Sequence, residues 1–453
     1  MSTSPQTTSS ALPEKSLPRA IGQLASTALV VGTIIGSGIF LVPHNVAEYV
    51  GSVGSLYLVW VVGGLLSLAG ALSLAELGAA TPEAGGIYVY LRQAYGKLIA
   101  FLYGWAMLLV VESGGIATLA VAFSIYSANF FPFTPFQQKV VATGVIALLT
   151  IVNILGVRKG AAVQTTFMFA KLVGLAIVVG FALFSSGIHP LPSVLPLPTE
   201  HTTWSSFGVA LVGVLWAYHG WHHLSYAAGE VKDPGRVLPR SFLWGMLVII
   251  LVYFSANFAY LRVLSLGALA EHQRVAARAM EVLAGPRGAA LVSALILCSI
   301  FGALNGNILG GARVLYAMAR DGVFFGAVGR VHSRYETPSL ALVIQGVWAA
   351  ILATSGTYEQ LYTYVIFTAW VFYAGAILAV VLLRRRLPNL ERPYRVWGYP
   401  FLPLAFSAAA LIIVANTLFR SPRESIVGLA LVLVGVPIYF AWRRFARRPS
   451  PQN

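Results

Sequence analysis

Three glycines and a serine interrupt an apolar stretch near the amino terminus. Residues 31–43 read VGTIIGSGIFLVP, with Gly36, Ser37 and Gly38 at the centre. Glycine costs about 1 kcal/mol in a helix interior, so the run predicts either close packing against another helix or a helix break. A break would divide the span into two shorter helices and expose the backbone N–H groups of these three residues at the amino terminus of the second one. The helix dipole is positive there, so this end favours the binding of a carboxylate.

A second apolar stretch, GVLWAYHGWHHLSYAAGE over residues 213–230, contains a histidine and glycine near its middle. A break here would expose backbone carbonyls from about Trp216 to His219, which accept hydrogen bonds from an ammonium group. The two breaks together predict a site for an α-amino acid. His219, His222 and His223 also raise the question of a metal, but adjacent histidines on a helix diverge by about 100°. No cysteine or nearby carboxylate completes a set, so neither a metal nor a cofactor is expected.

The composition places both stretches in a membrane. Of 453 residues, 58% are apolar and 10% charged, whereas soluble domains have about 25% charged residues. The net charge of +15 forms no continuous basic stripe, which argues against nucleic acid.

Residues 1–20 and 446–453 are expected to be tails. A bilayer-spanning helix needs about 20 apolar residues, and twelve such windows are predicted at 23–50, 53–80, 98–130, 140–156, 161–184, 204–229, 241–264, 289–320, 337–355, 359–383, 401–419 and 426–442.

The distribution of basic residues predicts the orientation of these spans. With the amino terminus inside, cytoplasmic segments contain 21 Lys and Arg residues and external segments contain 7, while Lys171 and Arg313 lie within apolar runs. Positive charge is retained on the cytoplasmic side, so both termini are expected to be cytoplasmic, in a multi-pass protein of the plasma membrane.

The interrupted spans are the first and the sixth, which indicates two halves of five helices each. Because five is odd, the second half enters from the opposite side, as in the inverted repeats of secondary transporters. The predicted fold is an all-α polytopic membrane protein. It comprises 12 transmembrane helices in a 5+5 inverted repeat (21–186 and 204–386) plus two extra helices (400–445), with helices 1 and 6 unwound.

Six motifs carry a family resemblance across nearly the whole chain: GTIIGSGIF (32–40), AELG with AGGIYVYL (75–91), LWAYHGW (215–221), FGALNG with AMARDG (301–322), RPYRV (392–396) and GLALVLVGVPIYF (428–440). They resemble the L-type amino-acid transporter family of the amino acid-polyamine-organocation superfamily, in a bacterial-type member. The resemblance implies a leucine-transporter-like fold. It also implies sodium-independent transport of amino acids, commonly by obligatory exchange.

The resemblance also implies roles for individual residues. The carboxylate contacts fall on Gly36, Ser37 and Gly38, and Trp216 takes the position of an aromatic outer gate. The amine-binding carbonyls fall on Ile34, Trp216, Ala217 and His219. His222 is also assigned to the substrate site. His219 and His222 depart from the family pattern, so the preferred side chain of the substrate cannot be inferred from the resemblance. Residues 124–138 lack the cysteine that eukaryotic members use to bind a glycoprotein, so no disulfide-linked heavy-chain partner is expected.

Two charged residues lie deep in the predicted spans. Lys171 is about 18 Å from the cytoplasmic boundary, and the resemblance implies that its amine occupies the position of sodium in sodium-coupled relatives; a structural ion pair is the alternative. Glu112, about 22 Å deep, is predicted to be a structural acid, a titrating group or a partner of Lys171.

Other polar residues of the spans leave two interpretations open. We expect Tyr253, Asn257 and Asn305 either to line a cavity or to form hydrogen bonds between neighbouring helices. Glu76 and Arg313 are expected near the cytoplasmic face, where they either form a gate or clamp or are ordinary surface side chains.

Three functions therefore compete: an amino-acid exchanger, a proton-coupled symporter in which Lys171 or Glu112 titrates, and an amino-acid sensor that moves no substrate. No HExxH, Walker A or GxSxG motif is present, which argues against an enzyme.

Overall fold

The computed structural model describes residues 19–83, 85–155, 173–184, 203–332, 334, 335 and 337–446. Regular structure in these ranges is helical, apart from one isolated parallel bridge between Ile21 and Val231. The main helices are α1 (Gln23–Ile34), α2 (Gly38–Tyr49), α3 (Val53–Ala80), α4 (Ile87–Tyr95), α5 (Lys97–Ala106), α6 (Glu112–Ser127), α7 (Pro135–Ile154), α9 (Trp204–Ala217), α10 (His223–Tyr226), α11 (Pro234–Val263), α12 (Leu266–Glu271), α13 (Val275–Arg320), α14 (Ser339–Ser355), α15 (Tyr358–Arg386), α16 (Phe401–Arg420) and α17 (Pro422–Ala446).

The helices agree with an all-α, multi-span protein. Eight of the described helices are long and apolar enough to cross a membrane, and the bent pair of α1 and α2 makes a ninth candidate. Three shorter apolar helices, at Val173–Phe184, Trp204–Ala217 and Ser339–Ser355, fall within the predicted fifth, sixth and ninth windows. Each of the twelve predicted windows therefore overlaps a helix, which is compatible with twelve spans.

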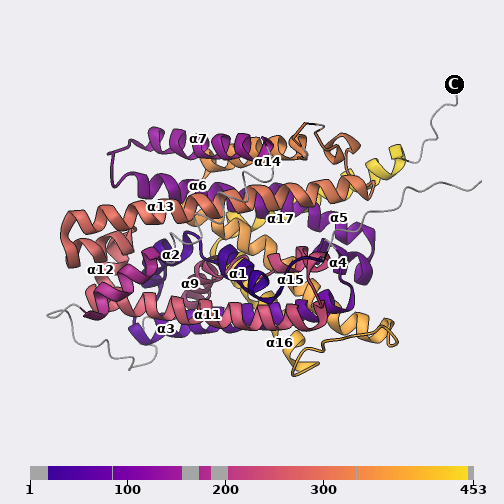
Figure 1. The fold of residues 1–453 in the computed structure, drawn as a ribbon, viewed down its shortest axis with the longest axis horizontal. Helices are drawn as coiled ribbons and strands as arrows, with labels where there is room; N and C mark the ends of the chain where they lie inside the picture. Colours follow the sequence, from indigo (N-terminus) through magenta and orange to yellow (C-terminus); the bar gives the residue numbers. More distant parts are fainter. Residues whose placement is uncertain are drawn as a thin grey trace, which may run out of the picture.

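The two broken helices lie inside the bundle. In Figure 1, α1 and α9 occupy the middle of the molecule, with α6, α7, α13 and α14 on one side and α3 and α11 on the other. The contacts agree, because α11 packs along α3 and α1, α2 packs on α9, and α6 packs on α13. The unwound segments are therefore surrounded by protein, where irregular backbone is tolerated at membrane depth.

The predicted third span is not a uniform α-helix. A π-helical turn, Met107–Val111, separates α5 from α6, and the N–H of Glu112 bonds the carbonyl of Met107. Single π-turns inside helices are rare and occur frequently at functional sites. The turn brings Glu112, whose side chain is 3% exposed, to the first position of α6.

Glu76 of α3 forms a clamp, which the sequence left as one of two interpretations; its carboxylate pairs with Arg384 and also lies 3.7 Å from Nε of Arg392. The carboxylate accepts hydrogen bonds from Nε and Nη2 of Arg384, at 2.7 and 2.6 Å, and from the N–H of Val396 at 2.7 Å. The guanidinium of Arg384 also lies 3.8 Å from the ring centroid of Tyr399. Glu76 thus joins α3 to the end of α15 and to the segment that precedes α16.

Replacing this buried carboxylate is expected to destabilise the bundle. Glu76→Gln removes the charge that pairs with Arg384, and a buried group left without its partner costs about 1–3 kcal/mol. The melting temperature of the purified protein in detergent should fall. Glu391→Gln, an exposed glutamate of the same segment, is the matched control and should melt like the wild type. Equal melting temperatures for all three proteins would contradict the role of Glu76.

Candidate functional site

Both predicted helix breaks are present in the structure. Helix α1 ends at Ile34 and α2 begins at Gly38, with a bend of 46° between them. Helix α9 ends at Ala217, and five residues in turns precede the start of α10 at His223. The prediction that helices 1 and 6 are unwound is therefore confirmed.

Two glycines let the breaks contact each other. A Cβ added at Gly38 would overlap the backbone of Ala217 and lie 2.7 Å from its Cβ. A Cβ added at Gly220, whose φ is 111°, would lie 2.7 Å from the carbonyl oxygen of Thr33. At Gly36, by contrast, a Cβ would make ordinary contacts of 3.5 and 3.7 Å. The glycine at position 38 is thus required by the contact between the two helices.

Two tyrosines also connect the breaks. The hydroxyl of Tyr253, on α11, donates at 2.8 Å to the carbonyl of Ala217 and lies 3.3 Å from that of Ile34. The hydroxyl of Tyr358, on α15, accepts from the indole N–H of Trp216 at 2.9 Å and lies 3.0 Å from the hydroxyl of Ser37. Tyr253 was a predicted polar residue of the site, and Tyr358 was not.

A small cavity lies where the breaks meet. Its volume of about 20 Å³ is the space of about one water molecule, so an amino acid enters only when the lining side chains separate. Of the predicted site residues, Ile34, Gly36, Ser37, Gly38, Trp216 and His219 line the cavity. The lining residues that the sequence analysis did not assign to the site are Thr33, Leu119, His223, Ala303 and Asn307.

His219 lines this cavity and carries a buried polar atom without a partner in the part of the chain that the structure describes. Its ring stacks on the ring of Trp216, with centroids 5.7 Å apart and planes at 18°. The Nδ1 atom is buried and has no hydrogen-bond partner among the described residues. Burying a polar atom without a hydrogen bond costs free energy. A polar ligand that bonds this atom would offset that cost, so the atom favours a polar ligand.

The other predicted residues lie outside the cavity lining. Ala217 contacts the cavity residue Gly38, and His222 is fully buried beside Tyr373. Asn257 donates to the carbonyl of Tyr253 at 2.8 Å, and Asn305 accepts from Asn153 on α7 at 2.7 Å. The asparagines thus bond within a helix and between helices. Lys171 lies outside the described residues.

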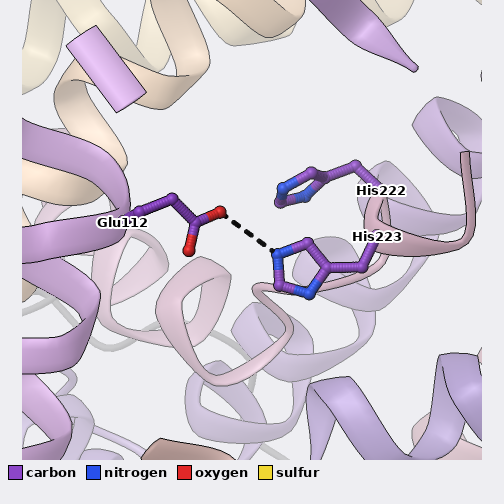
Figure 2. A group of neighbouring side chains, drawn as sticks. All are labelled: Glu112, His222 and His223. Atoms are coloured by element: carbon purple, nitrogen blue, oxygen red, sulfur yellow. Dashed lines mark ion pairs between the residues drawn. The ribbon is translucent and has the colours of Figure 1, made fainter. Parts of the chain in front are cut away.

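Glu112 faces His222 and His223, where the second break ends and α10 begins. Its Oε1 lies 3.5 Å from Nε2 of His223, which is one of the cavity residues. Figure 2 shows the carboxylate pointing toward the rings of His222 and His223. The expectation that no carboxylate lies near these histidines was wrong, because helix packing brings together residues far apart in the sequence. Among the described residues, the partner of Glu112 is His223; the alternative partner, Lys171, lies outside them.

A membrane-embedded helical bundle in which two broken helices meet at a central cavity is the architecture of a secondary transporter. The family comparison gives the same class. The chain belongs to the amino acid permease family, whose model matches residues 21–439.

Individual relatives cover nearly the full chain. The chain is 33% identical to the serine/threonine exchanger SteT of Bacillus subtilis over 434 residues, which span 95% of this chain and 98% of that protein. It is 32% identical to the b(0,+)-type amino acid transporter 1 of Rattus norvegicus over 455 residues, 99% of this chain and 91% of the relative. It is 29% identical to the human cystine/glutamate transporter over 450 residues, 96% and 87% of the two chains.

Proposed function

We propose that this protein exchanges α-amino acids across the plasma membrane, without sodium, by alternating access. The observation that carries the proposal is the meeting of the two breaks at one cavity, lined by Gly36, Ser37 and Gly38 from the first and by Trp216 and His219 from the second. The relative named as a serine/threonine exchanger, similar over almost its full length, supports exchange as the transport mode. The excess of basic residues in alternate loops supports an orientation with both termini in the cytoplasm.

In this proposal the substrate carboxylate binds at the start of α2. Backbone N–H groups there point along the axis, and the helix dipole favours an anion. The ammonium binds carbonyls at the ends of α1 and α9, among them those of Ile34, Trp216, Ala217 and His219. The hydroxyl of Tyr253 already bonds two of these carbonyls. The substrate ammonium therefore either binds the carbonyls together with this hydroxyl or displaces it.

Tyr358 is well placed to control access to this site. It bridges Ser37 and Trp216 from the first turn of α15, and separating these groups enlarges the cavity. We assign Tyr358 and the Trp216 indole to the external gate, because the other end of α15 carries Arg384, Arg385 and Arg386 and is therefore cytoplasmic in the proposed orientation.

Partner and cofactor requirements follow from the same proposal. The one cysteine of the chain, Cys298, belongs to α13 rather than to the 124–138 stretch. We therefore propose that transport needs no disulfide-linked heavy chain. We propose no cofactor, because transport leaves the substrate chemically unchanged.

Sodium replacement tests the proposed ion independence. Choline in place of external sodium should leave the initial rate of exchange unchanged, because the Lys171 ammonium supplies the fixed positive charge that sodium provides in coupled carriers. Lys171→Ala should reduce exchange strongly, whereas Lys139→Ala at the exposed start of α7 should not. A steep dependence of the initial rate on sodium concentration would overturn this part of the proposal.

A second candidate function is proton-coupled symport. The observation that favours it is the pair formed by the Glu112 carboxylate and the His223 imidazole, because His223 lines the cavity. Symport predicts that an inward proton gradient drives accumulation into vesicles without internal substrate. Exchange predicts that it does not.

A further inference from the structure

Glu112, His222 and His223 form a compact set of three potential metal ligands. One ligand atom from each residue lies within 4.8 Å of the others. Oε1 of Glu112 and Nε2 of His223 are 3.5 Å apart. Figure 2 shows the three side chains converging from two separate parts of the chain. This cluster lies beside the cavity and is distinct from the backbone groups that the proposed amino-acid site uses.

The backbone irregularities around the cluster bring its members together. His222 is the last residue of the second break, and His223 begins the four-residue helix α10. Their ring centroids lie 4.5 Å apart, with the planes at 71°. Glu112 follows the π-helical turn of the third span. The rule that adjacent helical histidines diverge therefore does not describe this site, and the third member comes from another helix.

The spacing suits a tetrahedral metal ion. Zn²⁺ binds histidine nitrogen and carboxylate oxygen at about 2.0–2.2 Å, and two histidines with one glutamate are a known donor set for it. Ligand atoms at the corners of such a tetrahedron lie about 3.3–3.6 Å apart. The contact between Glu112 and His223 already has this length. The remaining pairs of ligand atoms lie within 4.8 Å of each other, so metal binding requires them to approach by up to about 1.5 Å.

The cluster borders the cavity and has a hydrogen-bonding neighbour in Tyr373. His223 lines the cavity and its side chain is 14% exposed, whereas Glu112 and His222 are buried. The hydroxyl of Tyr373 lies 3.0 Å from Nδ1 and 3.3 Å from Nε2 of His222. Partners of this kind fix the orientation of a ligating imidazole.

We propose that Glu112, His222 and His223 bind one divalent transition-metal ion of the zinc type, with its fourth coordination position open to the cavity. The ion links α6 to α10, directly after the second break. One carboxylate neutralises part of the charge of the ion, and the two imidazoles bind in their neutral form.

Metal titration of the full-length protein tests this site. The chelator-treated protein in detergent is titrated with Zn²⁺ by calorimetry, and Co²⁺ is added separately to record its visible absorption. We expect one saturable high-affinity equivalent, proton release on binding, and the intense absorption bands of tetrahedral Co²⁺. Wild-type protein that binds no more Zn²⁺ than the His222→Gln/His223→Gln double variant would overturn the proposal.

Single variants distinguish the cluster from other histidines. Glu112→Gln and His223→Gln should each lose the saturable equivalent, while His219→Gln, in the same turn but outside the cluster, should keep it. Tyr373→Phe should weaken binding by about 10–100-fold, as the loss of an outer-shell partner does. Size-exclusion profiles confirm folding of each variant, and if Glu112→Gln does not fold, His223→Gln decides. Amino-acid exchange by the chelator-treated wild type is measured in parallel, so failure of the metal site is separate from failure of the proposed function.

Discussion

Liposomes preloaded with unlabelled amino acid should take up labelled amino acid at least about tenfold faster than liposomes without internal substrate, which corresponds to about 1.4 kcal/mol of differential stabilisation. In the proposed mechanism, alternating access changes the packing around the two breaks. A substrate that bonds one break through its carboxylate and the other through its ammonium stabilises the intermediate states. The measurement is the initial rate of uptake in reconstituted vesicles.

Two controls define the outcome of this experiment. A preload of an organic acid that lacks the amino group should not stimulate uptake, because it bonds only one break. Equal rates in loaded and unloaded vesicles would contradict exchange. If, in addition, an inward proton gradient drove accumulation and Glu112→Gln abolished that drive, symport would replace exchange.

Gly38→Ala should abolish transport, and Gly36→Ala should not. The methyl group at position 38 overlaps Ala217, and relief of such overpacking typically costs 1–3 kcal/mol and separates the breaks. At position 36 the methyl group meets Leu119 and Ala303 at ordinary distances, so the fold is retained. Because Gly36 lines the cavity, the added methyl group should raise the KM for substrate. Counterflow rates and melting temperatures are measured for both variants.

The comparison of these two glycines tests the structural assignment directly. If Gly38→Ala transported normally with an unchanged melting temperature, the contact between the breaks would be unimportant. If Gly36→Ala left the KM unchanged, the carboxylate would not bind at the start of α2.

The positions of the helix breaks were predictable because the interruptions are local. Gly36, Ser37 and Gly38 in one apolar run, and His219 and Gly220 in another, conflict with a continuous membrane helix at the level of single residues. The spans themselves follow from hydropathy, and α3 has the predicted bounds. Short helices such as α4 and α12 were not predicted, since they lie between the apolar windows.

The contacts between distant segments were not predictable in the same way. Glu112 meets His223 only because α6 packs near the end of the second break, and no spacing in the sequence encodes that packing. Tyr358 lies one residue before the predicted tenth span and reads as an ordinary interfacial aromatic residue. Its two hydrogen bonds depend on the positions of Ser37 and Trp216. The assignments of the carboxylate and ammonium sites, and the role of Lys171, stay predictions.

The reciprocal contact of the two breaks has a consequence for how this protein can evolve. Gly38 packs on Ala217, and Gly220 packs on the backbone of Thr33, so each segment sets the space that is available to the other. A larger residue in one segment is acceptable only after the opposite backbone has moved. The effect of a mutation in one segment therefore depends on which residues the other segment already has. Chimeras that exchange the first break alone between relatives should therefore be less fit than those that inherit both segments from one parent.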